Sequence, residues 1–199
     1  MLFRSATMPP KIRTLANKIL NNPEQINIAI SRPAEGIVQQ CYLVDDRSKL
    51  ELITGIMQEG SFKSIIIFAS TKDKVKQLDS TLRKAGFNCR AFHSDLEQRE
   101  REDIMREFKN RQLNMLIGTD VLSRGIDVEG IDLVINYDAP PDPEDYVHRI
   151  GRTARAERTG TAITFVNGAD QQRLKRIEEL IGITIERMPN PPGILSPSK

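Results

Sequence analysis

The chain has 199 residues, of which 39% are hydrophobic and 28% charged, a balance typical of a folded globular protein. Its formal net charge is only +2, which excludes a uniformly basic nucleic-acid-binding protein and requires any such contact to come from a local patch. With no Trp and 3 Tyr, the sequence also disfavours recognition of bases by aromatic stacking.

The first residues and the cysteines indicate a cytoplasmic location. The start, Met1 to Ser5, has no apolar core of signal-peptide length, and no apolar run approaches the length of a membrane span. Cys41 and Cys89 stand far apart without ligand-like neighbours, as thiols in a reducing compartment do. We therefore expect a soluble protein that binds neither a membrane nor a metal through these residues.

Helix-like and strand-like segments alternate along most of the chain. Apolar residues at helical spacing predict helices at residues 11–20, 46–59, 72–85, 96–109, 143–152 and 170–181. Short alternating or β-branched runs predict strands at 26–30, 37–44, 64–69, 88–92, 113–117, 132–137 and 161–166, with an edge strand at 183–186. A glycine-bearing loop is expected at 118–130, and the Pro- and Ser-rich residues 191–199 predict a flexible tail.

This alternation predicts an α/β fold with a mainly parallel central sheet and helices on both faces. Ligands of such sheets bind at the carboxyl ends of the strands. The segments that follow the strands at 64–69, 113–117 and 132–137 should therefore lie along one rim. We expect the threonine-bearing loops, a carboxylate and the following basic segment to share that neighbourhood.

The basic segment runs from His148 to Arg155 and carries arginines at 149, 152 and 155. A guanidinium is well suited to phosphate, because its planar fork donates several hydrogen bonds and stays charged. A spacing of three keeps such side chains on roughly one face of a helix. Taken alone, such a pattern is more often a solvated basic helix face.

Residues 119–127 (TDVLSRGID) and residues 148–155 (HRIGRTAR) resemble motifs V and VI of the DEAD-box RNA helicases, with Ala154 where Gly is usual in motif VI. Further matches, in the family's order, are Ser5-Ala6-Thr7 to motif III, Ile66-Ile67-Phe68 with Ser70-Thr71 to motif IV, and Gln98 to Arg101 to the Q-x-x-R element.

The resemblance divides the chain and implies a RecA-like three-layer sandwich. Residues 1–8 resemble the end of a first RecA-like domain, 9–30 the interdomain connection, and 31–190 the C-terminal RecA-like domain, followed by the tail. No G-x-x-x-x-G-K-[ST] phosphate loop and no D-E-A-D occurs in the sequence. Both lie in the first domain of the family, so we expect the isolated chain not to hydrolyse ATP.

The resemblance implies roles on the nucleotide side. Arg152 and Arg155 match the arginine fingers that reach the ATP phosphates across the interdomain cleft. Asp127 matches a ligand of the ribose hydroxyls, and Gly125 would let the backbone approach the nucleotide; the alternative is that both only shape a turn. The cofactor implied is ATP with Mg²⁺, whose protein ligands are expected in the first domain.

Other residues match coupling and RNA contacts. His148 is expected to couple the nucleotide and RNA sites together with Ser5 and Thr7, with a structural histidine as the alternative, whereas Arg149 is expected to make a structural ion pair. Contacts to the RNA backbone are expected from Ser70, Thr71, Arg101, Gly118, Thr119 and Asp120. For Arg101 the alternative is a solvated helix charge, and for Thr71 it is a helix N-cap.

The leading hypothesis is therefore the C-terminal half of an ATP-dependent RNA helicase. Its expected partners are single-stranded RNA, bound without sequence specificity, and the N-terminal RecA-like domain of the same protein, and we expect the chain itself to be monomeric. The alternatives are a non-catalytic RNA-binding or partner-docking module, and a related DNA helicase. The preference for RNA rests on the resemblance, since the sequence shows no recognisable reader of the 2′-hydroxyl.

Overall fold

One parallel sheet forms the centre of the computed structural model, which describes residues 36–125, 128, 130–153 and 159–197 and the single positions 14, 18, 19 and 33. Within these residues the strand order is β3-β4-β2-β5-β6-β1-β7, and every neighbouring pair is parallel. The strands are β1 (Ile37–Leu43), β2 (Ile65–Phe68), β3 (Cys89–Phe92), β4 (Met115–Gly118), β5 (Leu133–Asn136), β6 (Gly160–Val166) and β7 (Glu186–Met188).

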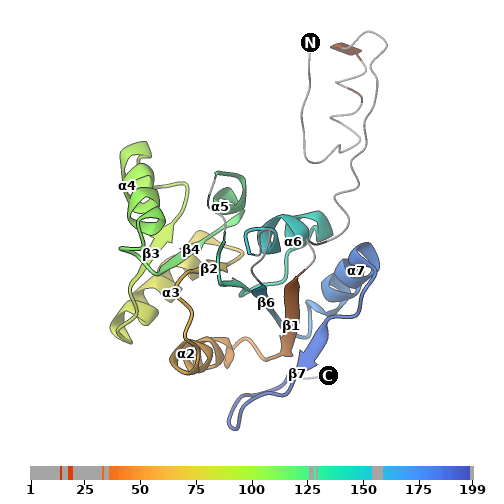
Figure 1. Cartoon of the computed structure of the whole chain (residues 1–199). Helices are drawn as coiled ribbons and strands as arrows, with labels where there is room; N and C mark the ends of the chain where they lie inside the picture. Colours follow the sequence, from red (N-terminus) through yellow and green to blue (C-terminus); the bar gives the residue numbers. More distant parts are fainter. Residues whose placement is uncertain are drawn as a thin grey trace.

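Helices cover the sheet on both faces, so the α/β three-layer prediction is confirmed (Figure 1). The helices are α2 (Lys49–Glu59), α3 (Lys72–Lys84), α4 (Gln98–Lys109), α5 (Asp120–Gly125), α6 (Pro143–Ile150) and α7 (Gln171–Ile181). Ile65 and Ile67 of β2 belong to the core beneath α2 and α3, whereas Ile66 and Phe68 belong to the core beneath α4 and α5. Helices α6 and α7 enclose a third apolar cluster on that second face.

The central strands explain this double covering. All four residues of β2, β4 and β5 are buried, as expected for short apolar runs with helices above and below. Burying such side chains contributes about 25 cal/mol per Å² of apolar surface removed from water. The core therefore fixes the three middle strands side by side, and with them the segments that follow.

Several boundaries differ from the sequence prediction, and three of the differences affect how an element is described. Residues 120–125, expected within a loop, form the short helix α5. Helix α6 ends at Ile150 rather than at 152, because Gly151 begins a turn. The last strand is Glu186–Met188, later than the predicted 183–186, and Ile185 before it is buried in the α6–α7 cluster.

Residues after β7 contact the body of the domain. The Leu195 N–H donates to Ser48 Oγ at 3.1 Å, and the Asp45 N–H donates to the Leu195 carbonyl at 2.8 Å. The Asn190 side-chain amide donates to the Leu43 carbonyl at 2.7 Å, and Ile194 packs against the core between α2 and the sheet. Of these residues, Ile194 and Leu195 belong to 191–199, for which a flexible tail stays a prediction.

The proposed remnant of a first domain at 1–8, the connection at 9–30 and the strand predicted at 26–30 lie outside the described residues, apart from the single positions named above. Among the described residues, no helix is both long and apolar enough to cross a membrane.

Candidate functional site

The carboxyl ends of three adjacent strands bring the sequence motifs together. Strand β2 lies between β4 and β5, and Phe68 pairs in register with Gly118 on one side and Asn136 on the other. Ser70, Asp120 and Asp138 each lie two residues beyond those paired positions. The predicted common rim of these three segments is therefore confirmed.

Arg149 of α6 links these segments from within. It is 1% exposed, and its guanidinium donates to Asp120 Oδ1 from Nε at 2.8 Å and from Nη2 at 2.6 Å. The second terminal nitrogen, Nη1, donates to Asn136 Oδ1 at 3.1 Å and to the Asp138 carbonyl at 3.2 Å. The same group lies 5.1 Å from the ring centre of Phe68. One side chain thus contacts the ends of β2, β4 and β5.

The ion pair expected for Arg149 is therefore confirmed. Its partner, Asp120, was expected to contact RNA, and its side chain is 36% exposed although it accepts both bonds from Arg149. A contact between Asp120 and RNA stays a prediction. The bonds from Arg149 fix the orientation of the Asp120 carboxylate.

The arginine segment, residues 148–155, starts near this rim, but Arg152 lies away from it. The Ile131 N–H donates to the Arg152 carbonyl at 3.3 Å, and Thr153 Oγ1 donates to the Ile131 carbonyl at 2.5 Å. Ile131 precedes β5, so Arg152 lies beside the β4–β5 connection rather than on the rim. Arg149 is buried within α6, whereas Arg152 lies half-buried beyond its end. The expectation of arginines sharing one helix face is therefore wrong for this pair, because the helix stops between them.

His148 lies half-buried in the last turn of α6. Its carbonyl accepts a long bond of 3.4 Å from Arg152 Nε. Its Nε2 is buried and finds no hydrogen-bond partner in the part of the chain that the structure describes. A buried ring nitrogen without a partner is uncommon and costs free energy, which singles this residue out.

The segment after β2 is held by backbone and side-chain contacts. The Ser70 N–H donates to Asp138 Oδ2 at 2.8 Å, while the Ser70 side chain lies at an exposed position. Thr71 Oγ1 accepts from the Lys74 N–H at 3.3 Å, so Thr71 is the N-cap of α3. The structural alternative for Thr71 is thus confirmed, and its RNA contact remains a prediction.

The remaining RNA candidates described here also have local structural partners. A Cβ on Gly118 would lie 2.8 Å from the Phe92 carbonyl, so this position has no room for a side chain. The half-buried Arg101 donates from Nε to the Leu96 carbonyl at 3.0 Å and from Nη2 to the Ser94 carbonyl at 3.4 Å. Arg101 therefore secures the loop after β3 and is not merely a solvated helix charge. The Thr119 carbonyl accepts a hydrogen bond from the Leu122 N–H at 2.8 Å, and Thr119 immediately precedes α5.

Three polar residues at this rim were not singled out from the sequence. Asn136 is fully buried and joins Arg149 to Thr164, Asp138 is 5% exposed, and Lys49 is 1% exposed. One signal for the first two was the polar Asn136 at the end of the apolar strand β5, with Asp138 two positions later. The signal for Lys49 was a lysine on the inward stripe of α2, in line with Leu52 and Ile53.

Asp127, Arg155, Ser5 and Thr7 lie outside the described residues, and of Gly125 only the backbone is described, as the last residue of α5. No group of three or more His, Cys, Asp or Glu suited to a metal ion occurs among the residues that were placed.

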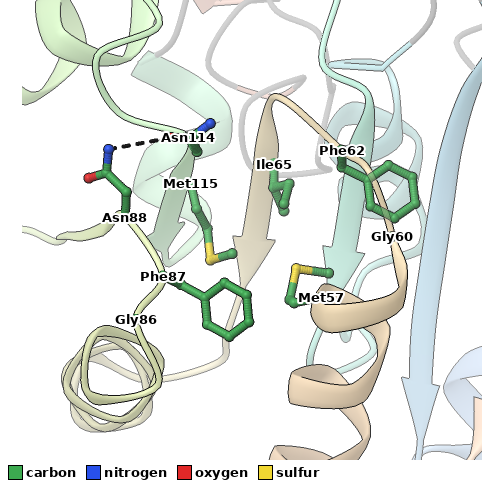
Figure 2. A pocket seen from close by; sticks show the side chains of 9 residues that line it. All are labelled: Met57, Gly60, Phe62, Ile65, Gly86, Phe87, Asn88, Asn114 and Met115. Atoms are coloured by element: carbon green, nitrogen blue, oxygen red, sulfur yellow. Dashed lines mark hydrogen bonds between the residues drawn. The ribbon is translucent and has the colours of Figure 1, made fainter.

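A cavity of about 280 Å³ lies at the opposite, amino-terminal edge of the sheet (Figure 2). Ile65 and Met115, the first residues of β2 and β4, line it together with Met57, Phe62 and Phe87. Its polar lining consists of Asn88 and Asn114, which bond each other at 3.3 Å. Uncharged walls on that edge do not suit phosphate groups, so the motif-bearing rim is the better candidate site.

Comparison with known proteins agrees with this geometry. Residues 48–157 match the family described as helicase conserved C-terminal domain. The chain is 38% identical over 191 residues to the DEAD-box ATP-dependent RNA helicase CshA of Bacillus licheniformis, covering 96% of this chain and 39% of that protein.

Solved structures of DEAD-box proteins share the fold. S. cerevisiae Dbp5 bound to RNA and ADP BeF3 has a TM-score of 0.83 at 32% identity, covering 93% of this chain and 50% of that one. E. coli DEAD-box protein SrmB bound to regulator of ribonuclease activity A has a TM-score of 0.75 at 32% identity, covering 83% of this chain and 100% of that one.

The fold and the rim thus define a RecA-like helicase domain of the C-terminal type. The chain belongs to the DEAD-box helicases, as their C-terminal RecA-like domain. It spans about two fifths of the length of the curated relatives it matches.

Proposed function

We propose that this chain is the C-terminal half of an ATP-dependent DEAD-box RNA helicase. It contributes Arg152 and Arg155 to an ATP site shared with an N-terminal RecA-like domain, and one part of the site for the single-stranded RNA backbone. The observation that carries this proposal is the ion pair between buried Arg149 and half-buried Asp120, which connects the segment after β4 to the arginine segment of α6. Relatives that match 96% of this chain are named ATP-dependent RNA helicases.

On the nucleotide side, the pairing of Ile131 with Arg152 and Thr153 supports the assignment. It holds Ile131, four residues after Asp127 in the sequence, against Arg152 and Thr153. The half-buried guanidinium of Arg152 fits a polyphosphate in charge and donor geometry. ATP supplies the phosphoryl group that is transferred, and an arginine finger stabilises the charge that develops on it, worth on the order of 10³–10⁵ in rate. The ligands of Mg²⁺ are assigned to the N-terminal domain.

On the RNA side, the rim offers hydroxyls and backbone amides rather than aromatic rings. Ser70 and Thr71 are exposed at the end of β2, and Thr119 lies at the end of the neighbouring strand β4. Such groups bind phosphate and sugar, and so position a strand without reading its sequence. Gly118 and Asp120 flank Thr119, and Arg101 supports the loop after β3.

The test of the finger is Arg152→Ala in the two-domain enzyme. We expect RNA-stimulated ATP hydrolysis to fall by at least about a hundredfold, because a finger stabilises charge in the transition state. The matched control is Arg176→Ala, which removes an exposed arginine of α7 and should leave the rate unchanged. Hydrolysis at close to the wild-type rate in Arg152→Ala would contradict the assignment.

A second candidate is a domain that docks RNA or protein without catalysis. The observation in its favour comes from SrmB, whose solved chain this chain covers completely. That SrmB chain is bound to a protein regulator. The two candidates differ in what the chain does beside its N-terminal domain. RNA-stimulated ATPase and unwinding by the two-domain protein support the helicase, whereas stable RNA binding by the isolated chain with no ATPase in the longer protein supports docking.

A further inference from the structure

The carboxylate of Asp138 joins two segments at the rim. Its Oδ2 accepts from the Ser70 N–H at 2.8 Å, and its Oδ1 accepts from Lys74 Nζ at 2.7 Å. Asp138 follows β5, whereas Ser70 follows β2 and Lys74 lies in the first turn of α3. Because Asp138 is only 5% exposed, this carboxylate is directed into the protein and not toward a ligand.

A buried lysine completes the arrangement. Lys49 Nζ lies 3.3 Å from Asp138 Oδ1 and 2.7 Å from Asp46 Oδ1, and 5.5 Å from the ring centre of Tyr137. Burial on its own would raise the pKa of Asp138, but the bonds from Lys74 and Ser70 and the charge of Lys49 outweigh it and lower the pKa to about 2. Asp138 is therefore an ionised acceptor at neutral pH.

The backbone of the same residue is held by the arginine helix. Arg149 Nη1 donates to the Asp138 carbonyl at 3.2 Å, and the rest of that guanidinium binds Asp120 after β4. Asp138 thus contacts the segment after β2 through its side chain and α6 through its main chain.

We propose that Asp138 is a positioning residue for RNA, which fixes the backbone at Ser70 so that the hydroxyls of Ser70 and Thr71 meet the RNA backbone in a set place. This inference rests on the proposed function. Ser70 lies at an exposed position, and both its backbone N–H and its side chain bond the Asp138 carboxylate, so the orientation of Ser70 depends on that acceptor. A binding group must be held to within about 0.5 Å of its productive geometry, which requires supporting bonds of this kind.

The experiment is Asp138→Asn in the two-domain enzyme, with ATPase followed as RNA is added. The amide has the shape of the carboxylate but only one acceptor oxygen, so either Ser70 or the lysines lose their partner. We expect the RNA concentration that gives half-maximal stimulation to rise about tenfold, the loss expected for a charge-assisted hydrogen bond. The KM for ATP and the rate at saturating RNA should change by less than about twofold. A purely structural role would instead lower the saturated rate and leave the half-maximal RNA concentration unchanged, which would overturn the proposal.

Two further variants test whether Asp138 acts through Ser70. Asp46→Asn removes the other carboxylate from Lys49, and the described partners of Asp46 are Lys49 and Asn167, not Ser70. This control should keep the wild-type RNA response. In a Lys74→Met background, Asp138→Asn should still weaken the response to RNA; loss of its effect there would mean that Asp138 acts only through Lys74 and would contradict the role assigned at Ser70.

Stability and function are separated by a last pair of measurements. Asp138→Asn leaves the buried Lys49 charge without this partner, which can reduce the folded fraction. The double variant Lys49→Met/Asp138→Asn removes both buried charges and should then restore the free energy of unfolding. The double variant must still need more RNA than Lys49→Met alone. A wild-type enzyme that RNA does not stimulate would contradict the proposed function itself. Wild-type stimulation with an unchanged half-maximal concentration in the double variant would contradict the positioning role alone.

Discussion

The Arg149 guanidinium and the Asp120 carboxylate meet at 2.6 Å although they belong to α6 and α5, and this contact orders the carboxyl rim. Arg149 is 1% exposed, so its charge has no access to water and depends on protein acceptors. It finds them in Asp120, Asn136 and the Asp138 carbonyl. The planar guanidinium of an arginine can donate hydrogen bonds to all three acceptors at once. The ammonium group of a lysine is a compact charge and cannot bond them in this geometry.

Replacing Arg149 by Met should therefore destabilise the isolated chain by about 3 kcal/mol, because buried acceptors lose their donor. Urea unfolding followed by circular dichroism measures the change. The control Arg106→Met breaks the exposed pair of α4 with Asp103 and should cost less than about 0.5 kcal/mol. A loss below about 1 kcal/mol in Arg149→Met would mean that the network does not stabilise the fold.

The ionisation of Asp138 should make the free energy of unfolding depend on pH. Its pKa is lowered to about 2 in the folded chain from 3.8, so its ionised form stabilises the fold above pH 3.8 and loses that contribution as the pH falls toward 2. The difference corresponds to about 2 kcal/mol. Asp138→Asn should thus be less stable than the wild type at pH 7, and the gap between them should narrow as the pH falls below about 4. A gap that stays constant down to pH 3 would contradict this origin of the stability.

Both cysteines should be unreactive in the folded chain. Burial raises the pKa of Cys41 to about 11, and burial with the nearby Asp79 raises that of Cys89 to about 12. Because the thiolate is the nucleophile, maleimide labelling at pH 8 should be at least about a hundredfold slower than after unfolding in urea. The introduced thiol of Ser80→Cys, at an exposed position on α3, should react rapidly and serve as the control. Fast labelling of the native wild type would contradict the burial.

Short, unbroken apolar runs predicted two of the central strands correctly. Residues 64–69 and 132–137 enclose β2 and β5, because a buried parallel strand carries its signal in every residue. Helix α5 was missed because its six residues are fewer than two turns, too short for a periodic pattern. Leu122 stabilises it by packing into the core, a contact that depends on the sheet.

The site was only partly predictable for a different reason. The motifs indicated Arg149 as an ion-pair residue and the segments after β2, β4 and β5 as neighbours, and both are confirmed. Lys49 and Asp138 were not indicated, because 89 positions separate them and nothing in either local pattern refers to the other.

The sequence by itself determined the type of fold and the order of the motifs, since both depend on residues close together in the chain. Periodicity reports which face of an element is apolar, and a motif reports its own residues. The tertiary structure decided which charges pair. The order β4-β2-β5 places the ends of three strands side by side, and Arg149 and Asp138 find their partners only there. The physical reason is that burial makes an unpaired charge costly, so the choice of partner depends on what the packed core brings within hydrogen-bonding distance.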